Sequence, residues 1–100
     1  MGSIISSRSN KDGKIIYEIE LDYAESLHLK GHIKKVCLFS EDACDAVSKL
    51  SSRGTHESTK YFLVPKELRA NLTTADKVKC QKIITDSKMI FIYVLDRVVI

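Results

Sequence analysis

Hydrophobic and polar positions alternate along several short stretches of the chain, which is the spacing of β-strands rather than of long helices. In KIIYEIEL (residues 14–21) the odd-numbered positions are all apolar, whereas the even-numbered ones are mixed. MIFIYVL (89–95) is almost wholly apolar and is as long as a strand. Asp22 is suited to cap a helix and Gly31 to end it, so one short helix is predicted between them.

The pattern predicts further short elements along the whole chain. Beyond the helix that ends near Gly31, they are strand 32–39, helix 41–51, polar loop 51–59, strand 60–64, helical turn 65–72, strand 77–84, turn 85–88 and strand 89–95. Such an order is typical of a mainly β fold with short helices, in the α+β class.

The polar loop is the best internal boundary, because it lacks any apolar residue and contains Gly54. We therefore predict three parts: a flexible tail over 1–13, a strand-helix-strand-helix unit over 14–52, and a unit over 53–100 that shares one core with it.

A shift of 45 residues aligns the apolar positions of the first half with those of the second. Residues 14–52 are accordingly interpreted as a diverged repeat, which would build a pseudo-duplicated β-barrel. The alternative is that any strand-helix-strand order gives such matches, and the first half carries helix 41–51 where the second has its closing strand.

Pro65, the only proline, lies in the stretch YFLVPKELRANL (61–72). Because proline fixes φ and lacks an N–H group, it suits the first position of a helix and holds Val64 extended. A sharp strand-to-helix corner is predicted, with Leu68 and Leu72 facing inward.

The segment LVPKELRANLTTADKVKCQKI (63–83) resembles the AbrB/MazE/SpoVT-type DNA-binding domain, and the resemblance covers about residues 58–96. Lys60 stands where that family has a basic residue before the strand, whereas TTAD replaces its Gly-Asp turn. The resemblance implies a small swapped-hairpin β-barrel, a homodimer, and binding of duplex DNA by a transcriptional regulator or an antitoxin-like protein.

Charge adds to this picture. Residues 1–52 hold seven Lys/Arg against eight Asp/Glu, whereas residues 53–100 hold nine against five, so the second half is basic. Clustered cations bind phosphates. The predicted DNA-binding residues are Arg53, Lys60, Lys66, Arg69, Lys77, Lys79 and Lys82, with His56 as a neighbour in the polar loop. Lysines on an outer strand face also serve to prevent aggregation, which is the alternative interpretation.

Catalysis and metal binding have little support in the sequence. Gly31 separates His28 from His32, and no second ligand pair suits zinc. Cys44 beside Asp45 is better explained as a packed thiol than as a nucleophile. No phosphate-binding glycine loop or hydrolase motif is present. We expect no enzyme activity and no cofactor.

Two other functions fit the same sequence. An apolar edge strand at 89–95 would suit a protein–protein adaptor or inhibitor, and a β-barrel could also bind RNA. Three widely spaced cysteines indicate a reducing cytoplasm. No apolar run is long enough to span a membrane. MGSIIS does match the loose myristoylation pattern at Gly2, a pattern that is also frequent by chance.

Overall fold

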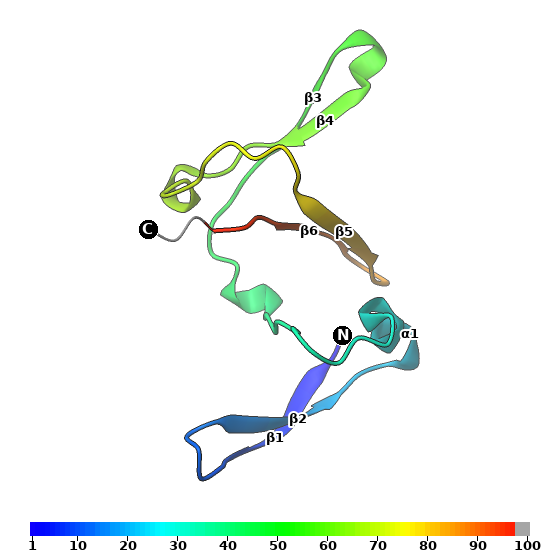
Figure 1. The fold of residues 1–100 in the computed structure, drawn as a ribbon. Coiled ribbons are helices and arrows are strands. Elements are labelled where there is room, and N and C mark those ends of the chain that lie inside the picture. The colour runs from blue at the N-terminus through cyan, green and yellow to red at the C-terminus, as the bar shows by residue number, and fades with distance from the viewer. Residues whose placement is uncertain (98–100) are drawn as a thin grey trace. The chain divides into compact units, whose positions relative to one another are not determined.

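The computed structural model describes residues 1–97, and it is mainly β (Figure 1). Three antiparallel two-stranded sheets, each a hairpin, are accompanied by one short α-helix. The predicted class, mainly β with short helices, is confirmed at this level, and no closed barrel is seen within residues 1–97. The described chain forms two units, residues 1–36 with 77–97 (unit 1) and residues 37–76 (unit 2). Residues 98–100, the end of the predicted 53–100 unit, lie outside the described residues.

Unit 1 begins with the hairpin of β1 (Ser3–Ser9) and β2 (Ile15–Glu20). The predicted strand at 14–21 is confirmed, but residues 3–9, expected in a flexible tail, form its partner. Ile4 lies opposite Ile19, so pairing with an apolar strand orders a segment that looks polar by itself. In the connecting turn, the Asn10 side-chain oxygen accepts hydrogen bonds from two backbone N–H groups at 3.0 Å each.

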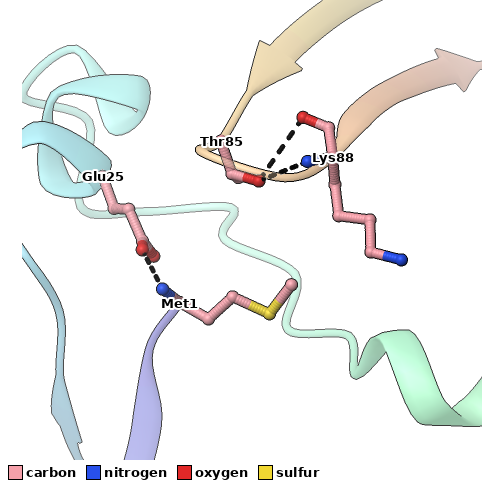
Figure 2. A network of polar contacts seen from close by, with 4 residues as sticks. All are labelled: Met1, Glu25, Thr85 and Lys88. Carbon is pink, nitrogen blue, oxygen red and sulfur yellow. Dashed lines mark hydrogen bonds and ion pairs between the residues drawn. The ribbon is translucent and has the colours of Figure 1, made fainter.

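The expected first helix is present as α1 (Tyr23–Ser26), continued by the 3-10 turn η1 (Leu27–Leu29). It ends where Lys30 and Gly31 take positive φ values of 51° and 78°. The Met1 amine contacts the Glu25 carboxylate (Figure 2), and this hydrogen bond raises the pKa of the amine above its ordinary value of 8.0.

The predicted strand 32–39 is wrong, because these residues form no strand. Lys35 has a φ of 58°, and a left-handed residue interrupts the extended backbone that a sheet needs. The shift of 45 residues aligns this segment with residues 77–84, which do form a strand. The repeat pattern therefore has no counterpart in the structure at this position.

Unit 1 closes with the hairpin of β5 (Lys79–Ile84) and β6 (Met89–Val94), which confirms the two strands predicted at 77–84 and 89–95. The turn between them is held by Thr85, whose hydroxyl accepts a hydrogen bond from the Lys88 backbone N–H at 3.0 Å (Figure 2). One face carries half-buried isoleucines, and the other carries exposed apolar side chains.

Unit 2 contains the hairpin of β3 (Leu50–Arg53) and β4 (Thr59–Phe62), joined through Gly54 and the 3-10 turn η3 (Thr55–Glu57). The predicted helix 41–51 is wrong. Its start is the single 3-10 turn η2 (Glu41–Ala43), after which the chain extends into β3. Asp, Cys, Val and Ser are weak helix formers, and the Ser48 hydroxyl donates to the Leu63 carbonyl oxygen instead.

No side chain of residues 1–97 is fully buried. An isolated two-stranded hairpin is only marginally stable, because it has one sheet face at most to bury. The apolar faces of these hairpins are thus open to further packing. Among residues 1–97, no helix is long and apolar enough to cross a membrane.

Candidate nucleic-acid interface

The Val64–Pro65 corner of unit 2 directs two of the predicted DNA-binding residues. Pro65 has φ −57° and ψ 149°, so it precedes the 3-10 turn η4 (Lys66–Leu68) as a capping residue. The prediction that it occupies the first helical position is wrong, because its ψ is extended. The Leu68 N–H donates to the Pro65 carbonyl oxygen at 2.9 Å and closes the turn.

The predicted helical turn 65–72 is consequently much shorter than expected. A single turn offers no i, i+4 face, and both Leu68 and Leu72 are exposed rather than facing inward. Asn71, with φ 63°, ends any continuation of the turn.

Arg69 is fixed by a bond across this corner. Its Nε donates to the Val64 carbonyl oxygen at 2.7 Å, which ties the guanidinium to the last extended residue before the proline. A charge-assisted bond of this length restricts the side chain. Because the bond uses Nε, the terminal guanidinium nitrogens can still reach an external acceptor.

The β3–β4 hairpin holds two more predicted residues. The Arg53 guanidinium lies 5.3 Å from the centroid of the Tyr61 ring. Lys60 Nζ donates to Ser52 Oγ at 2.8 Å, from the directly opposite position. Lys60 pairs with Ser52, and Arg53 is the next residue after Ser52. Because neighbouring residues of a strand point to opposite faces, Arg53 and Lys60 lie on opposite faces of the hairpin.

The other three predicted residues belong to unit 1. Lys77 precedes β5, Lys79 begins the strand opposite Val94, and Lys82 lies opposite Phe91. Lys79 and Lys82 are three residues apart on one strand, so they lie on different faces. The seven predicted cations therefore form two groups, four in unit 2 and three in unit 1.

A further basic segment, outside the predicted set, precedes the two groups in the chain and is linked to β5 in the structure. Residues 28–35 (HLKGHIKK) contain Lys30, Lys34 and Lys35 and no acidic residue. The net charge of the first half does not show these lysines, because its eight acidic residues cancel them. A count of charge over windows of eight residues shows them. The backbone of His28 is linked to β5, because Gln81 Nε2 donates to its carbonyl oxygen at 3.4 Å.

The described residues offer few other reactive groups. Within residues 1–97, no three His, Cys, Asp or Glu side chains are placed to hold a metal ion. Cys37, Cys44 and Cys80 are free and exposed, so Cys44 is not the packed thiol that the sequence suggested. His56 is also exposed, in η3.

What the arrangement supplies is exposed positive charge on short, hydrogen-bonded turns and hairpins. Such groups can bind phosphate oxygens without further chemistry. Comparison of the chain with protein-family models, with curated proteins and with solved structures finds no match.

Proposed function

We propose that the protein binds duplex DNA through the cations of unit 2 (Arg53, Lys60, Lys66 and Arg69) and acts as a transcriptional regulator or an antitoxin-like protein. The observation that carries the proposal is the Arg69 bond to the Val64 carbonyl oxygen, 2.7 Å long. It holds an arginine in place at the corner where the sequence resembles AbrB-type domains. A pre-positioned guanidinium loses less conformational entropy when it binds a phosphate or a guanine edge.

Neighbouring contacts support the same role. The Arg53 and Tyr61 pair presents a cation beside the ring of Tyr61, a residue that is 40% exposed. The Lys60 ammonium group uses one of its three N–H donors for the bond to Ser52. The other two donors can bind a phosphate. Lys66 begins the 3-10 turn on the same corner as Arg69.

The proposal includes a swapped-hairpin barrel formed by two copies of the chain in the cytoplasm. The exposed apolar faces of the hairpins favour it, because marginal hairpins gain stability when a second sheet covers them. Lys77, Lys79 and Lys82 are included as further phosphate contacts.

Fluorescence anisotropy with random-sequence duplex DNA between 50 and 200 mM salt tests the proposal. The four cations of unit 2 contribute about −3.6 to the slope of log affinity against log salt, or roughly 150-fold weaker binding over this range, and contacts by Lys77, Lys79 and Lys82 steepen it by about 0.9 each. Lys60→Ala with Arg69→Ala should reduce the magnitude of the slope by about 1.8, so that the salt-dependent loss of affinity over this range becomes roughly 12-fold smaller.

The matched control is Arg8→Ala with Lys11→Ala, which removes the same charge from the β1–β2 hairpin. Absence of DNA binding at 50 mM salt would overturn the proposed function. Equal slopes in the two double variants would show that overall charge, and not the corner, drives binding.

A protein–protein adaptor is the second candidate, and one observation favours it. On β5–β6 the face formed by Ile84, Met89, Phe91 and Tyr93 is exposed, between 43% and 58% for each side chain. Recovery of a stoichiometric protein partner that Phe91→Asp abolishes, together with no DNA binding, would support it. The RNA-binding alternative is tested by competition, and single-stranded RNA that displaces duplex DNA from the protein would support it.

A further inference from the structure

The segment His28–Lys35, called the basic loop below, is the most concentrated positive charge in the first half of the chain. It holds three lysines and two histidines without an acidic residue. All of its residues except the half-buried His28 are exposed, and Ile33 at its centre is 85% exposed. Nothing in the proposed function so far uses these residues.

The beginning of the basic loop has a defined backbone. The Lys30 N–H donates to the Leu27 carbonyl oxygen at 3.0 Å, and the His32 N–H donates to that of Leu29 at 2.9 Å. Positive φ values at Lys30 and Gly31 turn the chain away from the short helix. Lys30 therefore lies in a hydrogen-bonded turn, and Lys34 and Lys35 follow it.

The start of the basic loop is hydrogen-bonded to β5, the strand that also carries Lys79. Gln81 Nε2 donates to the His28 carbonyl oxygen at 3.4 Å, across 53 residues of sequence. Lys79 is two positions before Gln81 on β5, so it lies on the same face of the hairpin. This bond brings the start of the loop to the face that carries Lys79.

We propose that the basic loop and Lys79 form a second phosphate-binding surface, whose partner is the sugar-phosphate backbone of duplex DNA. The inference rests on the proposed function and extends its contacts in unit 1 from Lys79 to the basic loop. Lysine is a compact, flexible point charge, which suits backbone contacts that fix position without reading sequence. The Gln81 amide adds a neutral donor of the kind that also bonds phosphate oxygens.

A lipid surface is the competing partner, because Ile33 is an exposed apolar side chain beside two lysines. One isoleucine buries too little apolar area for stable anchoring, which requires a second signal. The chemistry of the loop is thus better matched to DNA.

The test is the variant Lys30→Gln, Lys34→Gln, Lys35→Gln, which removes three charges and keeps a long polar side chain at each position. Its matched control is Lys11→Gln, Lys14→Gln, Lys49→Gln, three lysines outside both surfaces. The intact chain, the two triple variants and the Lys60→Ala, Arg69→Ala variant are titrated with random duplex DNA across a salt series. The same proteins are titrated with vesicles of zwitterionic lipid containing phosphatidylserine. Circular dichroism verifies that each variant keeps its β signal.

Loss of about 2.7 from the magnitude of the salt slope in the loop variant, with a smaller change in its control, supports the second surface. An unchanged slope in the loop variant overturns it, even where Lys60 and Arg69 prove necessary and the proposed function stands. If the loop variant loses vesicle binding but keeps the salt slope of DNA binding, the assignment of DNA as partner is overturned. No DNA binding by the intact chain overturns both the surface and the proposed function.

Discussion

Replacing Arg69 by lysine separates two contributions of this residue. The substitution keeps one positive charge at the corner of unit 2, but it removes the Nε donor that bonds the Val64 carbonyl oxygen at 2.7 Å. Lysine has no planar fork and cannot donate to the backbone while presenting two further nitrogens outward. Arg69→Lys therefore changes position without changing charge.

The size of the effect follows from the exposure of this bond. A hydrogen bond of a charged group contributes more than a neutral one, but an exposed interaction is reduced by water to about 1 kcal/mol or less. If the bond holds the guanidinium in the position that binds DNA, the DNA affinity of Arg69→Lys at fixed salt should be lower by up to about fivefold. The salt slope should stay the same, because the number of neutralised phosphates is unchanged.

The assay compares Arg69→Lys with Arg69→Ala by anisotropy at several salt concentrations. Arg69→Ala should lose about 0.9 from the slope as well, which corresponds to roughly eightfold weaker binding at 0.1 M salt. The amide signals of Val64 and Lys66 in NMR spectra report whether the corner itself is retained. Wild-type affinity in Arg69→Lys, with altered Val64 and Lys66 signals, would refute the idea that the bond positions the side chain.

Two further predictions concern local structure. Gly54 has φ 90° and ψ −179°, a region adopted almost only by glycine, and an added Cβ would lie 3.3 Å from Ser58 Oγ. Gly54→Ala should cost about 1–3 kcal/mol and speed amide exchange in β3 and β4. Gly13→Asn changes a positive-φ glycine in the β1–β2 turn of the other unit, so it should leave exchange in β3 and β4 unchanged, and equal effects of the two variants would contradict this. The Met1 amine pKa is raised by the hydrogen bond to Glu25, so with the carboxylate ionised their contact is complete up to about pH 8.0 and is lost as pH rises through the raised value. NMR titration of the Glu25 carboxyl carbon should show this step, N-terminal acetylation should remove it, and a midpoint at or below 8.0 would disprove it.

The β5–β6 hairpin shows which part of the fold could be predicted from sequence. Ile83 and Ile84 on one side and the apolar run 89–95 on the other flank TDSK, whose Thr85 hydroxyl accepts a hydrogen bond from the Lys88 N–H. Every signal lies within 16 residues, and local pattern and turn chemistry agree there. The corner at Pro65 was likewise predictable in place, although not in its length.

The wrong predictions share a different cause. Residues 32–39 have strand composition, but the left-handed Lys35 breaks the segment. Residues 41–51 have helical spacing, but their end extends into β3 and pairs with β4. A short stretch of sequence carries little information about left-handed turns at non-glycine residues or about which strand a segment pairs with. Local propensity therefore predicted the wrong secondary structure for both segments.

The sequence by itself determined the mainly β class, the β2 strand, the β5–β6 hairpin and the position of the proline corner, because short-range periodicity and the fixed φ of proline act within a few residues. Only the tertiary structure decided that residues 3–9 form a strand, that Arg69 bonds Val64, and that Gln81 bonds the backbone of His28. Each of these depends on partners brought together by folding, at separations from 5 to 53 residues for the two bonds. The geometry of such contacts is set by chain reversal and packing, which hydrophobic spacing does not encode.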